Sequence, residues 1–151
     1  YEAALLLQAM QARLHFATDA GGAQLDVGSL WQAGVPARAL LTEIEMDTSD
    51  LLAFDYERSL RPLMTQALAL WRQPNGLHLG LTVATEHLAP VDLHLPLPGL
   101  APQQLASRAA AIARELFADL PAAFADGQIT HDYARRAGAA LLARQLESLH
   151  V

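Results

Sequence analysis

Histidine is the residue type most able to do chemistry in this sequence, and two of the six histidines fall where paired strands would bring them together. Alternating leucines over residues 77–97 predict a hairpin, and matching its apolar faces places His78 beside His94 on the opposite face. Imidazole nitrogens bind zinc, copper or nickel, so the pair could hold a metal with His15 or Asp92 as third ligand. Histidines on a solvated strand face are more often ordinary surface residues, and we therefore predict no metal here.

A second histidine pairing is predicted near the amino terminus. Apolar and polar residues alternate on both sides of a turn at residues 19–22, and matching Phe16 with Leu25 places His15 opposite Asp26. A carboxylate beside an imidazole can orient it for general base chemistry. A cross-strand polar contact needs no catalysis, so the sequence predicts this simpler role and no catalytic residue.

Acidic residues gather in the segment that follows. Their oxygens could bind a hard cation, but they lack the regular spacing of a calcium-binding loop. We interpret them as charges on a strand that discourage pairing at a sheet edge. The residues are Glu43, Glu45, Asp47 and Asp50.

The two tryptophans receive different predictions. Trp71 lies on an apolar stripe and is expected in the core, whereas Trp31 is the better candidate for an exposed contact. Together with the paired imidazoles, this gives the residues predicted to bind a partner, namely Trp31, His78 and His94.

Composition narrows the classes of protein. The 151 residues carry a net charge of −6 and contain no cysteine. Because an acidic chain is repelled by phosphate backbones and anionic lipid, neither nucleic acid nor a membrane is an expected partner. No apolar run approaches the ~20 residues that span a bilayer, so the cytoplasm is the default location. The common phosphate-binding, dinucleotide-binding, serine-hydrolase and zinc-protease motifs are absent from the sequence, which supports no cofactor and lowers the expectation of an enzyme.

The elements that position these residues predict one α+β domain over residues 1–151, with helices packed on an antiparallel sheet of about five to six strands. Residues 52–56 alternate like a strand although Ser49 could cap a helix, and we favour the strand. The other strands are expected over residues 13–17, 24–27, 40–46, 77–83 and 91–97, and the helices over residues 2–12, 30–33, 59–72 and 102–120 and from Thr130 onward.

The later hairpin has the most specific predicted register. Its apolar faces match when Leu81 pairs with Val91 and Leu79 with Leu93, which also pairs residues 77 and 95. Prolines at positions 96 and 98 indicate that the second strand lies at a sheet edge or ends there.

The strand Val91-Asp92-Leu93-His94-Leu95-Pro96-Leu97 and the following Pro98-Gly99-Leu100-Ala101-Pro102-Gln103-Gln104-Leu105 carry a resemblance to known families. They are similar to the strand, glycine-leucine bend and helix of the small acidic type III secretion chaperones and of the YbjN-like proteins. The resemblance implies a non-enzymatic protein-binding domain, chaperone-like or an adaptor, that acts as a homodimer on another protein or peptide segment. The alternative is a small α+β enzyme or ligand-binding domain with a histidine-containing site.

Overall fold

The computed structural model describes residues 2–58, 64–125 and 128–150, and it has an α+β fold, which confirms the predicted class. Its seven strands form two antiparallel sheets instead of the single sheet expected. The small sheet has the order β2-β1-β3, and the large sheet has the order β4-β5-β6-β7. The elements are α1 (Glu2–Ala9), β1 (Arg13–Thr18), β2 (Gly21–Asp26), α2 (Val27–Ala33), β3 (Leu40–Glu45), β4 (Leu51–Arg58), β5 (Thr65–Gln73), β6 (Gly76–Ala84), β7 (Val91–Pro98), the 3-10 turn η1 (Pro102–Gln104), α3 (Leu105–Ala118) and α4 (His131–Ser148).

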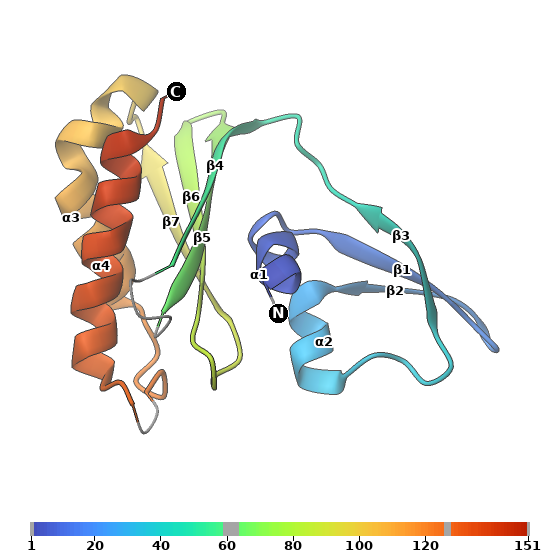
Figure 1. Ribbon diagram of the computed structural model, residues 1–151. Helices are drawn as coiled ribbons and strands as arrows, with labels where there is room; N and C mark the ends of the chain where they lie inside the picture. The colour runs from blue at the N-terminus through green and yellow to red at the C-terminus, as the bar shows by residue number, and fades with distance from the viewer. Residues whose placement is uncertain (1, 59–63, 126–127, 151) are drawn as a thin grey trace.

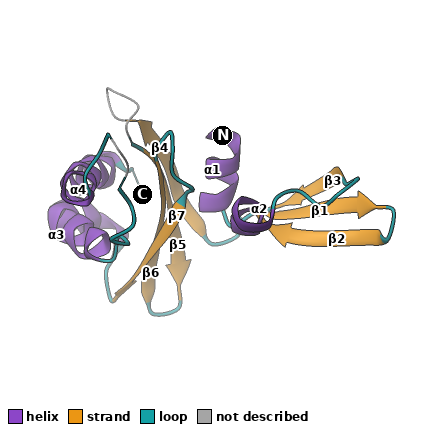
Figure 2. Cartoon of the chain, turned by 90° about the horizontal axis from the view of Figure 1, so that it is seen from below, coloured by secondary structure: helices purple, strands orange, loops and turns teal. Residues whose placement is uncertain are grey.

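The large sheet is covered on both faces. Helices α3 and α4 lie against one face and α1 against the other (Figures 1 and 2). The predicted apolar stripe of α3 is buried as expected, from Leu105 to Leu116. At the crossing of α3 and α4, a Cβ atom added to Gly138 would lie 2.2 Å from the ring of Phe117. A glycine is therefore what lets the two helices approach so closely.

The predicted helix over residues 59–72 is wrong, because Thr65–Gln73 forms β5, a central strand of the large sheet. Residues 65–70 are buried without interruption, since β5 has helices on both sides. A strand buried on both faces loses the polar alternation that identifies strands, and its apolar run then imitates a helix. The beginning of the predicted helix, residues 59–63, lies outside the described residues. The strand favoured at residues 52–56 is confirmed as part of β4.

The small sheet projects away from this core (Figure 2). One of its faces packs on a cluster of apolar residues that includes Leu14, Phe16 and Val27, beside α1 and α2. Its edge strand β3 is different, because all six residues are exposed. The small sheet is therefore a thin element with one partly covered face.

Both predicted hairpin registers are wrong by two residues. Leu14 pairs with Leu25 because the first turn has only two residues between Thr18 and Gly21. Gly21, directly after the turn, has a positive φ of +119°, which glycine adopts readily. In the second hairpin Leu81 pairs with Leu93 instead of with residue 91. The loop is therefore two residues longer than the predicted pairing implies, and within it the hydroxyl of Thr85 accepts hydrogen bonds from the amides of His87 and Leu88, at 3.2 and 3.0 Å.

Several boundary predictions are confirmed. The hydroxyl of Thr130 accepts a hydrogen bond from the amide of Tyr133 at 3.1 Å and caps α4. Strand β7, with its two prolines, forms an edge of the large sheet. Among the described residues, no helix combines the length and the apolar character needed to span a membrane.

Candidate functional site

An indole and two imidazoles form a cluster on the large sheet. Trp71 pairs with His78 across β5 and β6, on the face opposite to α3 and α4, because the flanking Leu70 and Leu79 point into the helix-covered core. The Trp71 and His78 rings are 6.0 Å apart, and the His78 and His94 rings are 5.4 Å apart and nearly parallel. The Trp71 and His78 ring planes are tilted by 47°, so the three rings form an aromatic ledge with a step between the indole and the imidazoles.

Gly80 makes this ledge possible. A Cβ atom at Gly80 would lie 2.7 Å from Cζ3 of Trp71 and 3.4 Å from Nδ1 of His94. The indole therefore rests directly on the backbone of β6, and His94, which pairs with Gly80, leans toward His78 from the diagonal position. Gly80 was not among the residues predicted for the site, although a glycine inside a strand is a signal for such a close approach.

The two histidines meet as predicted, although through a different register. Nε2 of His78 lies 3.3 Å from Nδ1 of His94, a hydrogen bond in which one ring donates and the other accepts. Burial, and to a lesser degree the neighbouring His94, lower the pKa of His78 below its usual value. At neutral pH this imidazole is therefore uncharged and suited to hydrogen bonding with a neutral ligand.

Trp71 also lines a cleft between the large sheet and the segments that connect it to the small sheet, which is called the inter-sheet cleft below. The cleft has a volume of about 460 Å³ and is formed by Gln11 after α1, the segment 47–50 between β3 and β4, and the turn between β5 and β6. A second hollow of about 250 Å³ shares Gln11, Asp47 and Trp71 with the first. An aromatic surface with amide, carboxylate and imidazole groups around it can bind a flat molecule with polar edges.

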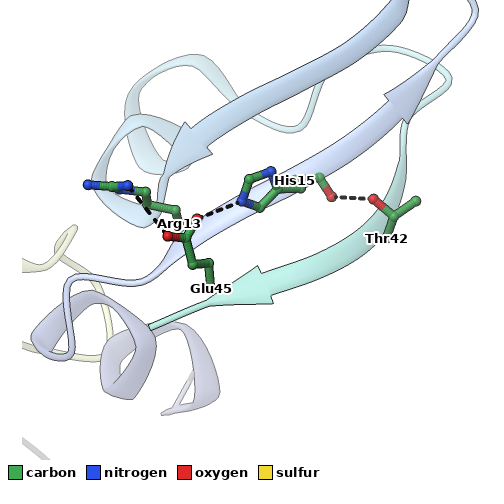
Figure 3. A network of polar contacts seen from close by, with 4 residues as sticks. All are labelled: Arg13, His15, Thr42 and Glu45. Atoms are coloured by element: carbon green, nitrogen blue, oxygen red, sulfur yellow. Dashed lines mark hydrogen bonds and ion pairs between the residues drawn. The ribbon is translucent and has the colours of Figure 1, made fainter. Parts of the chain in front are cut away.

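The predicted contact between His15 and Asp26 is wrong, because the register places His15 opposite Gln24. His15 instead lies 3.1 Å from Glu45 of β3, whose other oxygen is 3.6 Å from Arg13 (Figure 3). Asp26 caps α2 by accepting hydrogen bonds from the amide and the hydroxyl of Ser29. His15 is on the small sheet, so it is not a third ligand to the histidine pair of the large sheet.

Trp31 does not line the cleft. Its indole Nε1 donates a hydrogen bond to Gln8 at 2.8 Å, and the amide of Gln8 donates to Asp92 at 2.9 Å. The hydroxyl of Thr82 donates to the same carboxylate at 2.6 Å. Trp31 is therefore one end of a polar chain that links α2, through α1, to strands β6 and β7. Its predicted role in partner binding stays a prediction, like those of His78 and His94.

The acidic residues at 43–50 do not converge on a cation. Glu45 contacts Arg13 and His15, while Asp47 accepts hydrogen bonds from the amide and hydroxyl of Ser49, which lower its pKa. Within the part of the chain that the structure describes, no group of three or more potential ligands forms a metal site.

Comparison with known proteins shows a shared fold. No family model and no curated protein matches the chain. Among solved structures, quinoline 2-oxidoreductase from Pseudomonas putida 86 matches with a TM-score of 0.59 and 15% identity over 97% of this chain and 54% of that chain. The reconstituted CO dehydrogenase from Oligotropha carboxidovorans matches with a TM-score of 0.60 and 16% identity over 93% and 53%. The cyanide-inactivated Cu,Mo-CO dehydrogenase matches with a TM-score of 0.60 and 13% identity over 95% and 54%. The chain thus spans about half the length of the solved chains it matches.

These matches overturn the predicted function. The chain has the fold of part of each of these oxidoreductase chains, so the prediction of a non-enzymatic, chaperone-like or adaptor domain is contradicted, whereas the homodimer stays a prediction. The short strand-to-helix resemblance that suggested it covers β7 to the start of α3, a junction that many folds can contain. The assignment of residues 1–151 to a single domain stays a prediction.

Proposed function

We propose that this chain is a ligand-binding domain of an oxidoreductase, and that its inter-sheet cleft binds a planar nitrogen heterocycle against Trp71. The observation that carries the proposal is the ledge of Trp71, His78 and His94, in which the indole approaches the backbone of β6 at Gly80, and of which Trp71 and His78 line a cleft of about 460 Å³. A flat ring can stack on the indole while its nitrogen atoms exchange hydrogen bonds with the imidazole of His78.

Two further features support this ligand class. The cleft also contains the side chains of Gln11 and Gln73, whose amides both donate and accept hydrogen bonds at the edge of a heterocycle. In addition, one solved chain with this fold comes from a quinoline 2-oxidoreductase, and quinoline is a planar nitrogen heterocycle. The substrate and the partners of the complete protein are part of the proposal.

The test is a titration with quinoline and riboflavin as planar probes and cyclohexanol as a non-planar control. In a Trp31→Phe variant the only remaining tryptophan is Trp71, so its fluorescence should be quenched by the planar probes alone. Calorimetry on Trp71→Leu should show binding about 5- to 150-fold weaker, because stacking on an aromatic side chain contributes about 1 to 3 kcal/mol.

A matched control is Tyr133→Leu, which removes an exposed aromatic ring from α4, outside the cleft. Its affinity for the planar probes should equal that of the unmodified chain. Equal affinity in Trp71→Leu would refute the proposed site.

A further inference from the structure

Strand β3 lies at a sheet edge and exposes several aliphatic side chains, a combination that another protein segment often covers. It is an outer strand of the small sheet, and it exposes large aliphatic side chains. Leu40 is 69% exposed, Leu41 44% and Ile44 42%. Single exposed leucines are common on protein surfaces, but a cluster on one sheet edge is typical of a contact surface.

The two faces of β3 differ in chemistry. Ile44 lies opposite Leu14 and Leu41 opposite Phe16, so both face the apolar side of the small sheet. On the other face, Glu43 lies opposite His15 and Leu40 opposite Ala17. Glu45 lies opposite Arg13 on the same face and contacts both Arg13 and His15 (Figure 3). The edge therefore presents Leu41 and Ile44 on one face and two carboxylates, one of them already paired, on the other.

The other sheet edges are less suited to accept a strand. Strand β4, at one edge of the large sheet, has only Phe54 and Arg58 exposed. Strand β7, at an edge of the large sheet, contains Pro96 and Pro98, which have no backbone N–H to donate. Strand β2, at the other edge of the small sheet, begins with Gly21 and Gly22 and exposes only glycine, glutamine and aspartate. Strand β3 contains no proline and offers apolar contacts beside its backbone groups.

We propose that β3 binds an extended segment of a partner protein in which aliphatic and basic residues alternate, and that this segment becomes a fourth strand of the small sheet. The aliphatic residues would cover Leu41 and Ile44 while the basic residues meet Glu43 and Glu45. Charge disfavours a second copy of this chain as the occupant, since pairing β3 with itself brings the carboxylates of both copies and two net charges of −6 together. The inference is independent of the ligand proposed for the cleft.

The test uses labelled eight-residue peptides and fluorescence anisotropy. One peptide alternates valine and arginine, a second has the same composition as four valines followed by four arginines, and a third alternates valine and glutamate. The alternating valine-arginine peptide should bind at least tenfold more tightly than either control, and it should slow hydrogen exchange in β3. Equal binding of the two arginine peptides would overturn the proposal, because it would show attraction to charge without strand pairing.

Variants locate the contact. Ile44→Asp should weaken binding of the alternating valine-arginine peptide at least tenfold although it adds a negative charge, whereas Gln24→Asp on β2 adds the same charge and should leave that binding intact. If Ile44→Asp fails to fold, Leu41→Asp replaces it. An unchanged affinity in the β3 variant would overturn the proposal. So would sedimentation equilibrium that finds a dimer of the unmodified chain and a monomer of Ile44→Asp, because a second copy would then be the occupant.

Discussion

The large and small sheets of this chain are both antiparallel, but they bury their residues very differently. β5 is buried without interruption over residues 65–70, whereas β3 is exposed at each of its six residues. Burial of apolar surface is the main source of folding free energy. The large sheet should therefore carry most of the stability, and the small sheet should carry surface that is free for contacts.

The comparison is tested most strongly by removing the same kind of contact from each sheet region. Leu116→Ala deletes a fully buried side chain between α3 and the large sheet and should lower the free energy of unfolding by about 3 to 5 kcal/mol. Ile44→Ala on the small sheet should cost less than about 1 kcal/mol, because 42% of that side chain is already exposed. Urea unfolding measures both values, and similar losses would contradict the division of stability.

A second pair of variants adds a methyl group to each region. Gly138→Ala drives a Cβ atom into Phe117 and toward Met64, and overpacking of this kind should cost about 1 to 3 kcal/mol. Gly22→Ala on β2 meets only a carbonyl oxygen at 3.9 Å, so its unfolding free energy should change by less than about 0.5 kcal/mol. The melting temperatures should fall for the first variant and stay constant for the second.

The sequence predicts an element well when its burial depends on neighbouring residues, and poorly when its burial depends on segments far away in the chain. The α3 stripe and the Thr130 cap were predicted, because a helix with one solvated face and a local cap shows its pattern in neighbouring residues. β5 was mistaken for a helix because its surroundings come from α1, α3 and α4, far away in the chain. The division into two sheets is likewise a long-range property.

The candidate site was only half predictable. His78 and His94 were expected to meet, and they do, because a two-residue change of register keeps each side chain on its face and makes the rings diagonal neighbours. Trp71 was assigned to the core, since nothing local shows that its face of the sheet borders a cleft. That cleft needs Gln11 and residues 47–50, which only the folded chain brings to Trp71.

The hydrogen bonds of Gln8 link α2, beside the small sheet, to the large sheet. Without them, α1 and α2 should open more readily than the helices on the other face of the large sheet. Gln8→Ala removes the hydrogen bonds to Trp31 and Asp92, and we expect a loss of about 1 to 3 kcal/mol. Hydrogen exchange should accelerate in α1 and α2 more than in α3. Gln24→Ala, which removes an exposed amide from β2, is the control and should leave exchange in all three helices unchanged.

Acid should affect the small-sheet region through the cap of α2. Hydrogen bonds from the Ser29 hydroxyl and amide lower the pKa of Asp26 below its ordinary 3.8. Because the folded pKa is the lower one, the stabilisation is present above pH 3.8 and is lost as the pH falls through the folded pKa. Exchange of the α2 amides should therefore rise in this acidic range relative to α4.

Asp26→Asn is the control for this pH effect. An amide oxygen also caps helices but does not titrate, so the acid-induced rise in α2 exchange should be smaller in this variant. An identical rise in both proteins would assign the effect to other carboxyl groups.

Residues 10–12 connect α1, which packs on the large sheet, to the small sheet, and residues 46–50 connect the small sheet to the large one. Both connections border the cleft, through Gln11, Asp47 and Asp50. A molecule bound against Trp71 would contact both connecting segments at once. It would thereby restrict movement of the small sheet relative to the large sheet. Occupancy should then raise the temperature at which the small sheet unfolds and bring it closer to that of the large sheet.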